Sequence, residues 1–132
     1  FTLLLCTVHF TIPALTLNMK APGPLIMRQD RNIDADTVLL TGEEVARAVC
    51  WYLQRDDVYL VERAGELQYG LNYDDAKHRK LTPAQAGALI RKHRGKAMLV
   101  AEHDEYSRWQ PFLPAPVSVD SSGSKGYLLI RY

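Results

Sequence analysis

The fold of this chain is decided by residues 37–61, which read TVLLTGEEVARAVCWYLQRDDVYLV. The apolar runs at 37–40 and 58–61 are short and continuous, as in strands that are buried on both faces. Between them, Val45, Val49 and Leu53 recur at helical spacing and predict an amphipathic helix. Strand, helix and strand in this order form the unit from which parallel sheets are built.

Two of the predicted helices begin at a capping box, in which a threonine and an acidic or amide residue three positions later bond each other's backbone amides. Thr41 and Glu44 fit the first box, and Thr82 and Gln85 fit the second. Pro83 suits the first helical position, because the N–H that it lacks would have no partner there. Helices are therefore expected to start just after Thr41 and just after Thr82.

The rest of the sequence continues the alternation of strands and helices. Buried strands are expected at 97–101 and 127–130, a half-exposed strand at 66–69, and a short helix at 105–112. The sequence thus predicts an α/β domain over residues 36–132, with a mostly parallel sheet and helices on both of its faces.

Residues 1–19 carry no charged side chain. A secretory signal peptide would need a basic start, and a core helix of the domain would show a charged solvated face. The end of a transmembrane helix fits better, since Phe1–Leu17 supplies most of the roughly 20 apolar residues that a span requires. Two prolines and a glycine at 22–24 would stop that helix, so residues 20–35 are expected to form a linker.

The composition excludes several classes of protein. A chain of 132 residues with 47% hydrophobic residues fits one globular domain and is too short for a barrel of about 250 residues. A net charge of +1 gives no reason to expect nucleic acid as a partner. Two cysteines are too few for a disulfide scaffold, and no glycine-rich phosphate loop follows the first strand.

Three short patterns suggest chemistry, and each has a plainer explanation. Asp34 and Asp36 have the Asp-x-Asp form of some metal-binding transferases, but so short a pattern arises often in turns. Residues 102–105, Glu-His-Asp-Glu, follow a strand, yet consecutive side chains diverge, which suits a helix start. Cys50 has no evident base beside it in the sequence. We interpret all three patterns as structural and predict no metal site in this chain.

Residues 76–96 form a basic segment with no acidic residue. Its seven cations are Lys77, Arg79, Lys80, Arg91, Lys92, Arg94 and Lys96. Two interpretations remain open. The segment could face anionic lipid headgroups, or it could be an ordinary solvated surface with cations favoured near a helix C-terminus.

One long motif resembles a known family. Arg55-Asp-Asp-Val-Tyr-Leu60 is followed by Gly65-Glu-Leu-Gln-Tyr-Gly-Leu-Asn-Tyr73 and by Asp75-Ala-Lys77. Together with His93-Arg94 and the closing Leu128–Tyr132, these residues resemble the C-terminal region of the bacterial lipid A aminoarabinose transferases. The resemblance covers roughly residues 37–132.

The resemblance implies an integral inner-membrane glycosyltransferase whose soluble α/β domain lies on the periplasmic side. Such enzymes move 4-amino-4-deoxy-L-arabinose from undecaprenyl phosphate to lipid A of lipopolysaccharide, which gives resistance to polymyxin and cationic peptides. Membrane, donor and lipid A acceptor are then the expected partners, with no nucleic acid. The family's catalytic acid lies in an early loop that no position here matches. This chain is therefore expected to be inactive alone and to hold no cofactor, and a divalent metal would belong to the membrane part.

The best candidates for substrate contact are the cations Lys77, Arg79 and Lys80, with the rings of Tyr69 and Tyr73 facing sugar. Two departures from the family stand out: Asp74 replaces an expected proline, and residues 20–33 match poorly. The alternative hypothesis is a non-catalytic, membrane-tethered module that binds an anionic surface or a protein through the basic segment.

Overall fold

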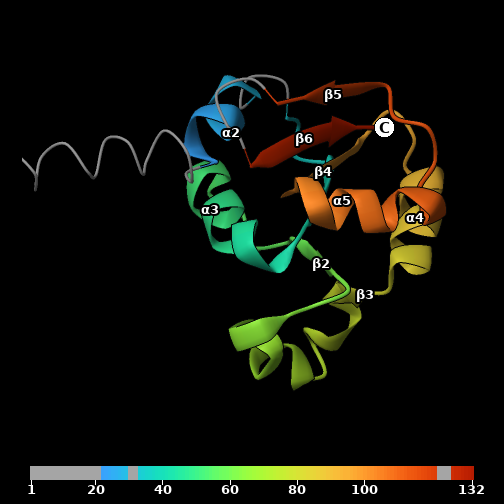
Figure 1. Cartoon of the computed structure of the whole chain (residues 1–132). Coiled ribbons are helices and arrows are strands. Elements are labelled where there is room, and N and C mark those ends of the chain that lie inside the picture. The colour runs from blue at the N-terminus through green and yellow to red at the C-terminus, as the bar shows by residue number, and fades with distance from the viewer. Residues whose placement is uncertain (1–21, 30–32, 122–125) are drawn as a thin grey trace, which may run out of the picture.

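The computed structural model describes residues 22–29, 33–121 and 126–132 (Figure 1). The strands are β1 (Val38–Thr41), β2 (Tyr59–Val61), β3 (Lys80–Leu81), β4 (Ala97–Glu102), β5 (Ser118–Asp120) and β6 (Tyr127–Arg131). The α-helices are α2 (Gly23–Gln29), α3 (Glu43–Leu53), α4 (Pro83–Lys92) and α5 (His103–Trp109). Single turns of 3-10 helix are η2 (Gly65–Gln68), η3 (Gly70–Asn72), η4 (Lys77–Arg79) and η5 (Gln110–Phe112).

The strands form one mixed sheet in the order β3-β2-β1-β4-β6-β5. The pairings β3–β2, β2–β1 and β1–β4 are parallel, whereas β4–β6 and β6–β5 are antiparallel. The prediction of a mostly parallel sheet is therefore wrong for the C-terminal half. Only residues 121–126 join β5 to β6, and a parallel connection needs a crossover of a dozen residues or more.

Helices cover both faces of the sheet, as predicted. On one face, α2 and α3 pack with Leu39, Met98 and Leu129 of the sheet. On the other face, Ile90 of α4 and Trp109 of α5 pack with further strand residues. Alternate residues of β4 point into the two clusters, which explains why its apolar run is continuous.

Part of the segment expected as a linker, residues 20–35, is helical. Leu25 and Ile26 of α2 are fully buried, and α2 lies against α3 (Figure 1). The transmembrane helix expected over residues 1–19 lies outside the described residues. Within the described residues, no helix is long and apolar enough to cross a membrane.

One capping box is confirmed and the other is wrong. Thr82 accepts from the Gln85 amide at 3.3 Å, and the Gln85 side chain accepts from the Thr82 amide at 2.8 Å. Thr41 instead ends β1, is fully buried, and donates its hydroxyl to the Gly42 carbonyl at 3.0 Å. Burial in the sheet thus outweighed the local signal, and α3 starts without a side-chain cap.

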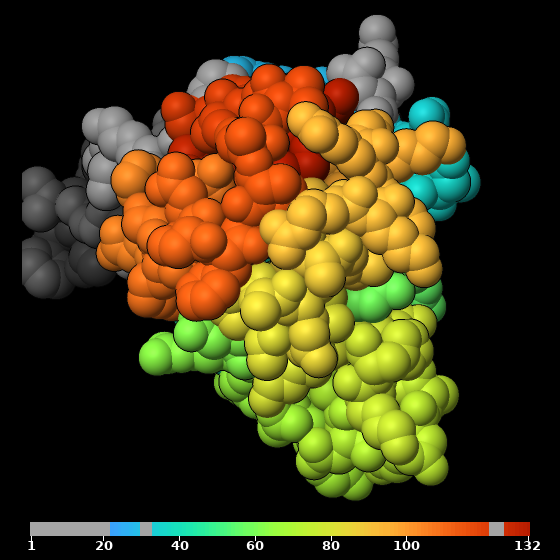
Figure 2. All heavy atoms as spheres, turned by 90° about the vertical axis from the view of Figure 1, so that its right-hand side faces the viewer, coloured from blue at the N-terminus to red at the C-terminus, as the bar shows by residue number. Residues whose placement is uncertain are grey.

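The half-exposed strand expected at 66–69 is also wrong, because this segment is helical. Gly65 has φ of +42°, a left-handed conformation suited to glycine, and starts a run of three 3-10 turns. None of residues 66–69 is β-branched, so strand propensity there is weak. We call residues 65–79 the 3-10 lobe; it projects below the sheet in Figure 1 and below α4 in Figure 2.

Candidate functional site

The 3-10 lobe carries four of the five predicted substrate-contacting residues, and the fifth, Lys80, follows it directly in β3. Tyr69 and Tyr73 lie one turn apart, with ring centroids 5.7 Å apart at an interplanar angle of 85°. Their hydroxyls lie 3.1 Å apart. The two side chains are 75% and 55% exposed, so their outer faces are open to a ligand. An edge-to-face pair of this kind keeps two rings in place at the surface.

The three predicted cations do not converge on one point. Lys77 pairs with the Asp74 carboxylate at 2.7 Å, and both groups are exposed. Lys80 donates to Gln68 Oε1 at 2.5 Å, and Gln68 in turn donates to Asn72 at 2.8 Å. The Arg79 guanidinium bonds the carbonyl of Asp56, in the loop between α3 and β2.

An apolar hollow separates the 3-10 lobe from α3. Its wider part, about 730 Å³, is bounded by Trp51 and Arg47, and its narrower part, about 290 Å³, reaches Arg79. Cys50 lies in the wall of both parts. Burial raises the pKa of the Cys50 thiol, an effect that the nearby Asp56 carboxylate reinforces. A thiol with a raised pKa is a poor nucleophile, which agrees with a structural role.

The carboxyl edge of the parallel strands is closed by a carboxylate. The chain leaves β1 and β4 in opposite directions, so a ligand of an open α/β sheet would bind between their ends. Glu105 of α5 fills that place: it is 7% exposed and lies against Gly42, which follows β1. Burial raises the pKa of Glu105. Among the described residues this edge has no glycine-rich phosphate loop, and Arg108 beside it already faces the carboxylates of Glu105 and Glu62.

A second carboxylate at this edge was not predicted. Glu62 follows β2 with φ of +68°, and its side chain accepts from the Trp109 indole at 3.0 Å. Arg108 lies 3.5 Å from the same oxygen. The Trp109 hydrogen bond is the main cause of a lowered Glu62 pKa. The end of the apolar run at Val61 could have predicted that Glu62 lies at the edge of the sheet. No pattern in the sequence predicts its hydrogen bond with Trp109.

The Asp-x-Asp pattern and the acidic residues 102–105 both form contacts within the domain. Asp36 of the Asp-x-Asp pattern pairs with Lys96, which lowers the Asp36 pKa. Residues 102–105 cap α5, because Glu102 and Glu105 form a capping box with each other. Among the described residues, no three His, Cys, Asp or Glu side chains come together in a group that could hold a metal ion.

The basic segment divides into bonded and unbonded cations. Besides Lys77, Arg79 and Lys80, Lys96 has its ion pair with Asp36, and Arg91 donates to the Phe112 carbonyl at 3.5 Å. Within the part of the chain that the structure describes, Lys92 and Arg94 make neither an ion pair nor a side-chain hydrogen bond.

The fold is an α/β domain built on one mixed six-stranded sheet, and its 3-10 lobe presents a pair of exposed tyrosines. The family model described as "Arabinosyl transferase ArnT, C-terminal domain" matches residues 17–130. The chain belongs to this family.

Curated relatives agree with the family. The chain is 33% identical over 125 residues to an undecaprenyl phosphate-alpha-4-amino-4-deoxy-L-arabinose arabinosyl transferase of Edwardsiella ictaluri, covering 92% of the chain and 22% of the relative. A transferase of the same name from Shewanella sediminis is 37% identical over 82 residues, which are 61% of the chain and 15% of the relative. The chain thus spans about a fifth of the length of these relatives.

A solved structure shares the fold. The crystal structure of ArnT from Cupriavidus metallidurans bound to undecaprenyl phosphate matches with a TM-score of 0.57 at 16% identity. The match covers 83% of this chain and 19% of that one.

Proposed function

We propose that this chain is the C-terminal domain of an inner-membrane glycosyltransferase that moves 4-amino-4-deoxy-L-arabinose from undecaprenyl phosphate to lipid A. The observation that carries the proposal is the family match over residues 17–130. It is supported by relatives that share the arabinosyl transferase name and of which the matches cover only 15% and 22%. The domain lies on the periplasmic side in this proposal.

In the proposed reaction, a phosphate oxygen of lipid A attacks the anomeric carbon of the donor sugar. A carbon–oxygen bond forms there, and the bond to the polyprenyl phosphate breaks with its electron pair on the leaving phosphate. Both lipids are anionic, so cations that meet phosphate lower the cost of bringing them together. Among the described residues, no base or nucleophile is placed where a lipid substrate would reach it. We therefore assign the catalytic step to the membrane part of the enzyme. Any divalent metal is assigned there as well, since Asp36 is already paired with Lys96.

The 3-10 lobe is the part of this domain that we assign to substrate. Lys77 pairs with Asp74, and Lys80 donates to Gln68; both contacts are exposed. Because exposed polar contacts of this kind contribute little free energy, a phosphate group can replace Asp74 and Gln68 at small cost. The open faces of Tyr69 and Tyr73 suit the apolar face of a sugar ring. Arg79 bonds the Asp56 carbonyl and so ties the end of the lobe to the loop before β2.

The test measures aminoarabinose transfer to lipid A in membranes that contain the full-length transferase. Lys77→Glu with Lys80→Glu is expected to raise the KM for lipid A by roughly 30-fold, because two cations near an anionic lipid surface contribute about 1 kcal/mol each. Lys92→Glu with Arg94→Glu is the matched control, from the far end of the same basic segment. An equal rise in KM for the two double variants would refute the assignment of the 3-10 lobe to substrate binding.

A second measurement tests the family-level proposal. The 132-residue chain alone is expected to show no transfer, and the full-length protein is expected to show it. Transfer by the chain alone would mean that its own residues are catalytic. A full-length protein that has only a short anchor before this domain and no transferase activity would favour a membrane-tethered binding module.

A further inference from the structure

Helix α3 exposes a large aromatic side chain that nothing in the described structure covers. Trp51 is 72% exposed, whereas Trp109, the other tryptophan of the chain, is 1% exposed. Trp51 also borders the 730 Å³ hollow, whose wall is largely apolar. Tyr52 on α3 and Met27 on α2 are 39% and 63% exposed. These two helices lie side by side on one face of the sheet (Figure 1).

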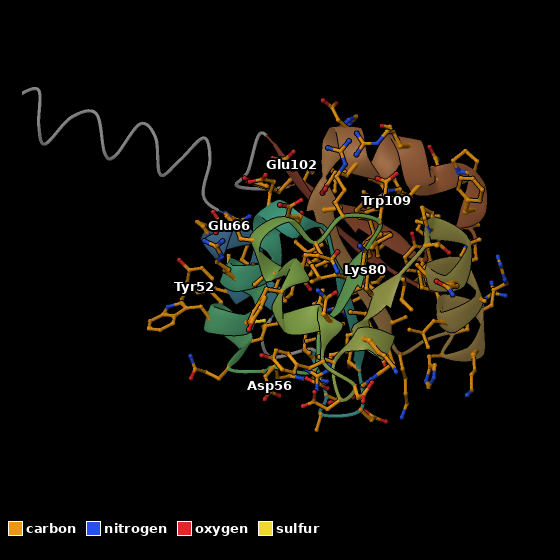
Figure 3. The ribbon with its side chains drawn as sticks, turned by 90° about the horizontal axis from the view of Figure 1, so that it is seen from below. Tyr52, Asp56, Glu66, Lys80, Glu102 and Trp109 are labelled. Carbon is orange, nitrogen blue, oxygen red and sulfur yellow. The ribbon has the colours of Figure 1, made fainter. Side chains whose placement is uncertain are left out.

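The position of α2 relates this surface to the start of the chain. The Tyr52 ring lies directly against Gly23, where a Cβ atom would collide with it. Figure 3 shows Tyr52 at the edge of the domain, on the side of α3. Four residue steps separate Gly23 from residue 19, the last of the uncharged stretch, and they can extend at most about 14 Å. If that stretch ends a transmembrane helix, Tyr52 lies within about that distance of the bilayer surface.

The composition of the surface fits a bilayer interface. Tryptophan and tyrosine concentrate at the level of the lipid headgroups, where an apolar ring and a polar N–H or O–H are both satisfied. Arg47 precedes Trp51 by one helical turn and borders the same hollow, where it pairs with the exposed Glu66 carboxylate.

We infer that the outer side of α3, centred on Trp51, docks into the headgroup layer of the membrane and fixes the orientation of this domain over it. This inference rests on the proposed membrane attachment of the chain. Trp51 is the anchor, and Tyr52 and Met27 extend it toward α2. The 3-10 lobe lies across the hollow from α3, so this docking would keep the lobe close to the membrane surface.

The experiment uses the fluorescence of the whole 132-residue chain, reconstituted in vesicles of phosphatidylethanolamine and phosphatidylglycerol. Subtracting the emission of Trp51→Phe from that of the unmodified chain isolates Trp51, because Trp109 contributes to both. The expected result is a blue-shifted Trp51 emission that is largely lost when the lipids carry bromine near the glycerol. Phe112→Trp in the Trp51→Phe chain is the matched control: Phe112 is 50% exposed but lies beside α4, on the other face. Its emission should not respond to brominated lipid.

Each other outcome has a definite meaning. A Trp51 emission that stays at the wavelength of water-exposed tryptophan, and is quenched by iodide but not by brominated lipid, overturns the inference. Trp51 shielded from iodide yet insensitive to brominated lipid also overturns it, in favour of a protein contact. Alkaline washing separates the two proposals: a chain released from the vesicles contradicts membrane attachment itself, whereas a retained chain with an unquenched Trp51 contradicts only the docking surface.

Discussion

The carboxylate of Glu105 occupies the space beside the α-carbon of Gly42, at the point where β1 and β4 end next to each other. A Cβ atom at Gly42 would overlap the carboxylate. In nucleotide-binding sheets this place is open and receives the ligand. Here a side chain of the domain fills it, so the likeness to nucleotide-binding folds stops at the order of the layers.

Gly42→Ala is expected to destabilise the domain by about 1–2 kcal/mol, because the added methyl group displaces a buried carboxylate. Urea unfolding followed by circular dichroism measures the change. Gly70→Ala is the matched control, since a Cβ atom there would meet no atom within 4 Å, and it should change stability by less than about 0.5 kcal/mol. Similar losses for both variants would show that Glu105 does not restrict Gly42.

Glu105 should make the domain less stable as the pH rises. Burial raises its pKa in the folded state above the ordinary value of 4.5, so the folded state holds the proton more tightly than the unfolded state does. Stability therefore falls as the pH rises from about 4.5 through the folded pKa. Glu105→Gln keeps an acceptor for the Glu102 amide and should gain stability over the unmodified chain across that window. A constant difference from pH 4 to pH 8 would contradict this account.

Glu62 should act in the opposite direction. The Trp109 hydrogen bond and Arg108 hold the Glu62 pKa below 4.5 in the folded state. The stability contributed by the charged carboxylate is thus present above about pH 4.5 and is lost as the pH falls through the folded pKa. We expect Glu62→Gln to be less stable than the unmodified chain at pH 7 and to lose that deficit in acid. Thermal unfolding from pH 3 to pH 7 measures it, and a deficit that grows in acid would exclude the mechanism.

Thr82→Ala should cost about 1 kcal/mol of stability, because it removes the oxygen that accepts from the Gln85 amide at the start of α4. Thr82→Ser keeps that oxygen and should retain most of the stability. Chemical denaturation of the three proteins provides the comparison. If the serine variant lost as much as the alanine variant, the threonine methyl group, and not the cap, would be the stabilising group.

Local signals in the sequence predicted most of the helices and buried strands. The capping box at Thr82 and the apolar run of β4 are examples, since both depend on residues close together in the chain. The same kind of signal failed at Thr41, where pairing of β1 with two distant strands buried the side chain. The two-residue β3 and the polar β5 carry no apolar run and were missed for that reason.

The site was less predictable than the fold. The sequence placed Tyr69, Tyr73, Lys77, Arg79 and Lys80 close together, and the structure brings the tyrosines into contact but gives each cation a different partner. Those partners come from backbone carbonyls and side chains whose position depends on three 3-10 turns. The fit of Glu105 against Gly42 joins residues 63 positions apart, and no local pattern records it.

The position of β1 in the middle of the sheet also determines when the domain can form during synthesis. One neighbour, β2, follows within about twenty residues, but the other, β4, starts at residue 97, and β6 must still pair with β4. A nascent chain that ends before β4 therefore exposes β1 as an apolar edge that can pair with other chains. Ribosomes that stall in α4 should accordingly yield fragments that aggregate or are degraded, whereas those that stall after β6 release a domain whose sheet is complete.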